Sequence, residues 1–163
     1  MTVQTAPRSL SEQRQVITNY QREAPVNVVP IANALGINVY KVPGWPSDLS
    51  GMIKSDTASP GGFSIFVNAN HAVNRRRFTI AHEIAHAVLH PHLIGDGITD
   101  DALLRSGLPD PVEYQANKMA ADILMPHHLL DPLLQSGITD VSELARRFRV
   151  SDQAMSIRLG VPQ

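Results

Sequence analysis

The sequence predicts an α+β fold, with a small antiparallel sheet, a helix carrying an H-E-x-x-H motif, and a helical C-terminal portion. Three observations predict it. Strand-like segments separated by Pro- and Gly-containing turns lie between residues 37 and 68. The hydrophobic period then changes from strand-like to helical at about residue 74. Beyond Pro126 the chain holds only short helical segments.

The N-terminal part begins with two helices. Ser9 or Ser11 is expected to cap a first helix that runs to about Glu23. Pro30 suits the first turn of a second, short helix, and Gly36 suits its C-terminal end. The strands that follow are expected at residues 37–42, 49–55 and 63–68.

The motif helix is expected from Asn74 to His90, where Pro91 closes it. A loop from Gly95 to Pro111 follows, and it contains several aspartates. The next helix is expected to start with Asp110 as its cap and Pro111 at its first position, and to hold residues 112–124.

Short helices at about residues 127–135, 140–147 and 151–159 finish the chain, and the last two have helix-turn-helix spacing. We therefore expect one main domain over residues 1–126. Residues 127–163 are expected to form a small helical subdomain packed on it.

Composition narrows the kinds of function that fit. The chain has 163 residues, 43% of them apolar, and a formal net charge of −1, so nothing in its overall charge favours nucleic acid or an anionic membrane. It has no cysteine, which excludes disulfides and thiolate metal ligands. No signal-like apolar run opens the sequence, so a cytoplasmic protein without membrane association is expected.

His82, Glu83 and His86 form the H-E-x-x-H motif. On a helix the two histidines project from one face, about 6 Å apart along the axis, and can converge on one ion. Neutral imidazole suits Zn²⁺, while the glutamate between them is placed to accept a proton from water without being a ligand. The motif predicts a zinc-dependent peptidase with Glu83 as the catalytic residue.

A catalytic zinc needs a third protein ligand, and the candidates are His90, His92, Glu113 and the loop aspartates. His90 lies about 12 Å along the helix from His82, so a supporting role beside the metal suits it better. His92 falls on the last position of H-E-x-x-H-x-x-G-x-x-H. However, Leu89 replaces the glycine that lets the chain turn there, so His92 is the runner-up ligand.

Glu113 is the preferred third ligand, supplied by a second helix. Ala116 and Ala120 would let that helix approach the motif helix closely. The alternative stays open that Glu113 forms a capping box with Asp110 and does no more than fix the helix start.

Two stretches carry a family resemblance, RRRFTIAHEIAHAVLH at residues 75–90 and EYQANKMAADILMP at residues 113–126. Together they resemble the ImmA/IrrE family of zincin-like metallo-endopeptidases. The resemblance implies that His82, His86 and Glu113 ligate Zn²⁺ and that Glu83 activates water. It also implies a protein substrate, a helix-turn-helix transcriptional repressor cut at one site in stress response or in the control of mobile-element or toxin–antitoxin genes.

Other roles remain open at this point. Tyr114 and His90 are candidates for assisting near the metal or the oxyanion. The C-terminal arginines, Arg146, Arg147, Arg149 and Arg158, support a competing hypothesis of a DNA-binding module, although the lack of net basic charge argues against direct DNA binding. A further alternative is a zinc-binding interaction protein without peptidase activity.

Overall fold

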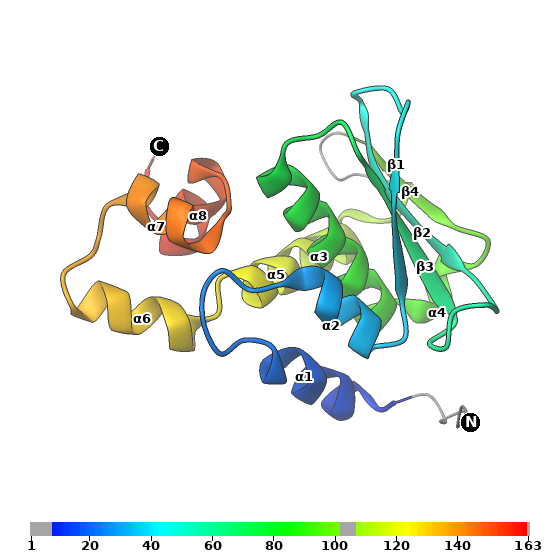
Figure 1. The fold of residues 1–163 in the computed structure, drawn as a ribbon, viewed down its shortest axis with the longest axis horizontal. Coiled ribbons are helices and arrows are strands. Elements are labelled where there is room, and N and C mark those ends of the chain that lie inside the picture. The colour runs from blue at the N-terminus through cyan, green and yellow to red at the C-terminus, as the bar shows by residue number, and fades with distance from the viewer. Residues whose placement is uncertain (1–7, 102–106, 163) are drawn as a thin grey trace.

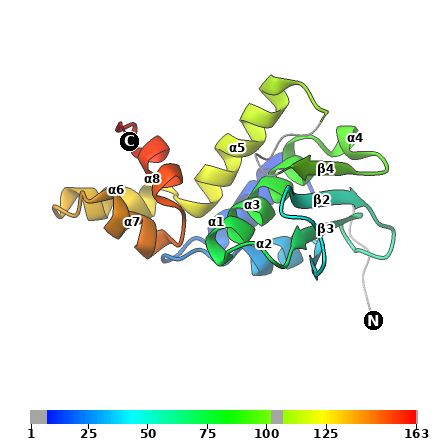
Figure 2. The ribbon, with the colours of Figure 1, turned by 90° about the horizontal axis from the view of Figure 1, so that it is seen from above.

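The structure is a computed structural model that describes residues 8–101 and 107–162. Helices gather on one side of a mixed sheet, and α6–α8 lie at the end of the molecule away from the sheet (Figures 1 and 2). The strands are β1 (Asn38–Val42), β2 (Leu49–Ser55), β3 (Phe63–Asn68) and β4 (Ile98–Asp101). The helices are α1 (Leu10–Asn19), α2 (Val28–Ala34), α3 (Val73–Leu89), α4 (Pro91–Ile94), α5 (Asp110–Leu124), α6 (His127–Gln135), α7 (Val141–Phe148) and α8 (Asp152–Leu159).

The sheet has the order β1-β3-β2-β4. β2 is antiparallel to both of its neighbours, but β1 and β3 run parallel. The prediction of a purely antiparallel sheet is therefore wrong for this pair. The two strands can pair in parallel because β3, the third strand in the sequence, is inserted between β1 and β2. β4 forms inside the segment that was expected to be a loop.

Most local sequence signals predict the observed helices and strands correctly. β2, β3 and α6 have the expected bounds, and Ser9 closes a capping box with Glu12 at the start of α1. The first helix ends at Asn19, short of Glu23. The expected cap at Asp110 is wrong, because this residue is already helical and Pro109 occupies the cap position.

The core lies between the sheet and α5, with α3 running through it. Every residue of α3 from Thr79 to Val88 is buried. Ala81 and Ala85 on α3 and Ala116 and Ala120 on α5 have no exposed surface. Small side chains of this kind let two helix backbones approach closely, and α3 and α5 form the most extensive helix–helix contact of the fold.

Both ends of the chain are tied to this core. The side-chain amide of Gln21 donates to the carbonyl oxygens of Asp122 and Ile123 at the end of α5, each at 2.9 Å. The Arg77 guanidinium donates to the carbonyl oxygens of Phe148 and Arg149, at 3.2 and 3.1 Å. The end of α7 and the turn that follows it therefore contact the start of α3. Among the described residues, none of the helices could cross a membrane.

Candidate metal centre

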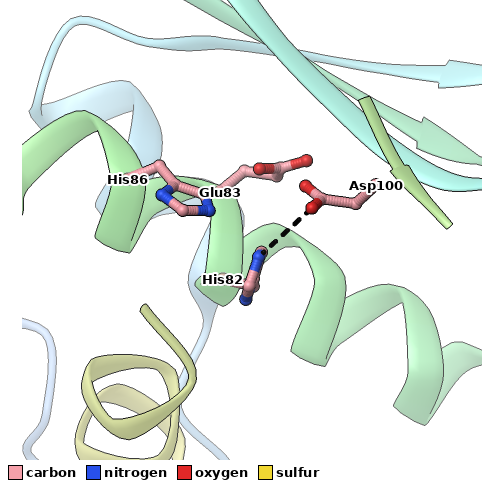
Figure 3. Close-up of side chains that lie close together, drawn as sticks. All are labelled: His82, Glu83, His86 and Asp100. Atoms are coloured by element: carbon pink, nitrogen blue, oxygen red, sulfur yellow. Dashed lines mark ion pairs between the residues drawn. The ribbon is translucent and has the colours of Figure 1, made fainter. Parts of the chain in front are cut away.

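The α3 helix holds the motif side chains in the interior. His82, Glu83 and His86 have no exposed surface, and the two imidazole rings meet edge to face with their centroids 4.7 Å apart. Figure 3 shows the three side chains on one stretch of α3, with Asp100 facing them from β4. This is the convergence that histidines four residues apart on a helix predict.

Glu113 reaches the same point from the first turn of α5. Its Oε1 lies 3.0 Å from Nε2 of His86, and its Oε2 lies 3.6 Å from Nε2 of His82. No side chain caps the start of α5, so the capping-box interpretation of Glu113 is not realised. The structure thus brings together the four residues that the sequence had selected, His82, Glu83, His86 and Glu113.

Asp100 is a member of the group that the sequence did not single out. Its Oδ1 lies 3.6 Å from Nε2 of His82, and its side chain is completely buried. The sequence placed it among several aspartates in one segment, and nothing in the residue order separates it from Asp96 or Asp110. The one usable signal is the alternation of Ile98 and Asp100, which puts both on the same face of a strand.

The far nitrogens of both histidines are also engaged. Nδ1 of His82 lies 2.9 Å from Oδ1 of Asn117, and Nδ1 of His86 lies 3.1 Å from Nδ1 of His90. His90 continues through Nε2 to Oε1 of Gln115, at 2.8 Å. If His90 donates to Gln115, its Nδ1 must accept from His86, which leaves Nε2 of His86 with a lone pair for a metal.

Two residues considered from the sequence lie elsewhere. Tyr114 is 68% exposed on α5, and His92 is exposed on the short α4 helix. The structure places neither of them in the buried group. His90, by contrast, lies in van der Waals reach of His86, with ring centroids 5.3 Å apart.

The electrostatics of the group reflect carboxylates buried beside imidazoles. Burial raises the pKa of Glu83 well above its ordinary value, and the negative charges of Asp100 and Glu113 add to the effect. Burial would lower the pKa of His82, but its contacts with Asp100 and Glu113 outweigh burial and raise that pKa to about 9. For Glu113, burial is outweighed by His82 and His86, which lower its pKa to about 2.

The donor set fits a divalent metal. Zn²⁺ bonds of about 2.0–2.1 Å in a tetrahedron place neighbouring ligand atoms about 3.3 Å apart. The separations of 3.0, 3.6 and 3.6 Å between the imidazole nitrogens and the carboxylate oxygens bracket that length. Nε2 of His82 and both carboxylate oxygens of Asp100 are buried without a hydrogen-bond partner among the described residues. Imidazole nitrogens and carboxylates in this state are suited to a cation.

Comparisons with known proteins give the family of this chain. Residues 32–160 match the Peptidase M78 family model, described as the IrrE N-terminal-like domain. The chain is 40% identical over 94 residues to the radiation response metalloprotease IrrE of Deinococcus deserti, and 38% identical over 94 residues to that of Deinococcus radiodurans. Each match covers 53% of this chain but only 32% and 27% of the two relatives.

The fold has a counterpart among solved structures. A Mycobacterium tuberculosis transcriptional regulator superposes with a TM-score of 0.60 over 94% of this chain and 46% of its own length. Its 18% sequence identity extends the likeness to the fold alone. The family match covers most of the chain, including the motif helix and the helix that supplies Glu113. This chain therefore belongs to the Peptidase M78 family, the family of the IrrE N-terminal-like domain.

Proposed function

We propose that this chain is a zinc-dependent endopeptidase in which His82, His86 and Glu113 hold the metal and Glu83 is the general base. The observation that carries the proposal is the meeting of Glu113 with Nε2 of both histidines at a point where all three residues are buried. Two imidazoles and one carboxylate, with a further glutamate beside them, are the donor set of hydrolytic zinc sites.

The chain's own residues divide the work of peptide hydrolysis. When bound, Zn²⁺ supplies Lewis-acid polarisation of the scissile carbonyl and of the attacking water. Glu83, next to the ligand His82 on α3, accepts the proton of that water and delivers it to the leaving amine. Asn117 and His90 orient the rings of His82 and His86 by contacting the Nδ1 atom of each ring. Burial keeps bulk water away from the carboxylate.

For the substrate we propose a helix-turn-helix transcriptional repressor, cut at one site in a cytoplasmic regulatory or stress response. The support is the family resemblance, together with relatives that are named radiation response metalloproteases. We also propose that residues 127–163 are a small helical subdomain packed on the main domain, which the packing of α7 against α8 and the hydrogen bonds from Arg77 to Phe148 and Arg149 support.

The test compares the chain with its Glu83→Gln variant. Both proteins are loaded with Zn²⁺ and incubated with a helix-turn-helix repressor encoded beside the gene, and new N-termini are identified by mass spectrometry. The expected result is one dominant cleavage by the unsubstituted chain and a loss of at least about 100-fold in rate for Glu83→Gln, since a positioned acid–base group contributes that much.

Metal content is measured on the same samples. Equal zinc content with lost cleavage assigns the loss to Glu83 itself. Full cleavage by Glu83→Gln would contradict the mechanism. Zinc binding without cleavage of the repressor, or of a mixture of unfolded proteins, would instead favour a zinc-binding interaction protein.

A further inference from the structure

The strand β4 adds a residue to the metal centre that the proposed catalytic set does not use. Among the described side chains, three carboxylates lie around the two imidazoles, and Glu83 and Glu113 already have roles there. Asp100 is the third, and it comes from a different element. It has no exposed surface, and no lysine or arginine within the described ranges pairs with it.

A buried carboxylate needs a strong partner to offset the loss of its hydration. Neither oxygen of Asp100 has a hydrogen-bond partner among the described residues, and its nearest basic group is Nε2 of His82, at 3.6 Å. That nitrogen is itself one of the expected metal ligands. A cation bound by His82 would therefore lie beside Asp100 and would offset its buried charge.

The geometry of the sheet directs Asp100 to this position. In the β2–β4 ladder Leu49 pairs with Asp101 and Gly51 pairs with Asp100, so Ser50 is an extra residue in β2. Bulges of this kind bend a strand locally and re-aim its side chains. Ile98 and Asp100 face the interior together, and the ladder fixes that orientation from Ile98 onward.

We propose that Asp100 is a fourth protein ligand of the metal, so that the resting chain holds its zinc with two histidines and two carboxylates. This inference rests on the metal site of the proposed function. A catalytic zinc keeps one position for water, whereas four protein ligands close the site. Asp100 must then withdraw from the metal before a water molecule and a peptide carbonyl can use that position.

The test measures access to the metal rather than peptidase activity. The chain, its Asp100→Ala and Asp100→Asn variants, and an Asp96→Ala control are loaded with Co²⁺, whose visible spectrum reports its ligands. Each is titrated with acetohydroxamate. Asp96 is the matched control because it is an exposed aspartate of the same segment.

The expected result is that acetohydroxamate binds Asp100→Ala and Asp100→Asn at least about tenfold more tightly than it binds the unsubstituted chain. Zinc affinity, measured by competition with a chromophoric chelator, falls at least about tenfold in the same variants, the lower end of what substitutions around a metal cost. Asp96→Ala changes neither quantity. Thermal melts of the zinc-loaded proteins check that the folds are intact.

Two results would overturn the inference. Equal hydroxamate binding and equal zinc affinity in all four proteins would show that Asp100 is not a ligand, while leaving the site of His82, His86 and Glu113 in place. Failure of the unsubstituted chain to bind Zn²⁺ or Co²⁺ would remove the proposed function and this inference together. The metal content of the unsubstituted chain distinguishes the two cases.

Discussion

Glu113 and His92 are the two candidates for the third protein ligand of the metal, and the structure separates them by burial. Glu113 contacts both imidazoles, while His92 is exposed on α4. We expect Glu113→Ala to weaken zinc binding more than about 100-fold, beyond the range for residues that only support ligands. His92→Ala is expected to leave zinc binding unchanged. Zinc content after dialysis against a chelator measures both, and the reverse pattern would exchange the two assignments.

Asn117 fixes the orientation of His82 from the side of the ring away from the metal. Because its Oδ1 accepts from Nδ1 of His82, that nitrogen keeps the proton when the ring is neutral, and the lone pair of Nε2 is left for the metal. We expect Asn117→Leu to weaken zinc binding about 10–100-fold and Asn117→Asp, which keeps an acceptor oxygen, to restore most of it. Chelator competition gives the values. Equal loss in both variants would point to packing rather than to the hydrogen bond.

Zinc uptake is expected to depend on pH through His82. Its pKa is raised to about 9 from 6.5, so at pH 7 the metal-free imidazole carries a proton that zinc must displace. The raised pKa stabilises the metal-free fold fully below pH 6.5, and this contribution is lost as the pH rises through about 9. Apparent zinc affinity should therefore rise up to about tenfold per pH unit between pH 6.5 and 9.

Calorimetry in buffers of different ionisation enthalpy measures that proton directly. We expect about one proton released from His82 per zinc bound at pH 7. Uptake without proton release at pH 7 would contradict a charged His82 in the metal-free chain.

Among the site residues, those on helices could be predicted and the one on β4 could not. The spacing of His82 and His86 places both on one face of a helix. Glu113 lies on the same helix as Ala116 and Ala120, the small residues that predict close packing against the motif helix. Asp100 depends on a four-residue strand, ITDD, in which Ile98 and Thr99 favour a strand and the two aspartates disfavour it. Its conformation comes from hydrogen bonds to β2, which no local pattern encodes.

The orientation of the strands also depends on contacts between distant parts of the chain. The turns around Gly44 and Gly61 mark where strands end, but they do not determine which strands become neighbours. The parallel pairing of β1 with β3 follows from the insertion of β3 between β1 and β2. α2 contacts β1, and α3 contacts β2 and β3, so the strand order goes together with long-range contacts that no local pattern encodes.

Gly51 shows how closely β2 approaches α3. A Cβ at this position would lie 2.6 Å from Cγ2 of Thr79 and 3.1 Å from Oε2 of Glu83. We expect Gly51→Ala to lower the free energy of unfolding by about 1–3 kcal/mol, the usual cost of overpacking, and to reduce cleavage by displacing Glu83.

Gly107→Ala is the matched control, because a Cβ there meets nothing within 4 Å. Urea unfolding followed by circular dichroism compares the two variants. Equal stability of Gly51→Ala and Gly107→Ala would mean that the sheet and helix separate at little cost.

At the scale of the whole molecule, the C-terminal helices are part of the packed structure. Arg158 donates to the carbonyl oxygen of Met125 and pairs with Asp122, and Arg147 pairs with Glu143. Two of the four arginines that a DNA-binding interpretation needs are thus engaged within the chain. We expect no measurable duplex binding in gel-shift titrations at 150 mM salt, as befits a chain of net charge −1. Binding that weakens steeply with salt would revive the DNA-binding hypothesis.

The Gln21 side chain has a consequence for where this domain can be cut. Its side-chain amide donates to the last carbonyl oxygens of α5, and the backbone carbonyl oxygen of Gln21 lies 2.7 Å from Nε2 of His128. The family match begins at residue 32, after this segment. A shortened protein that starts there would leave three polar groups at the end of α5 and the start of α6 without their partners. A protein cut to the stretch that the family model matches is thus expected to be less stable than the whole chain.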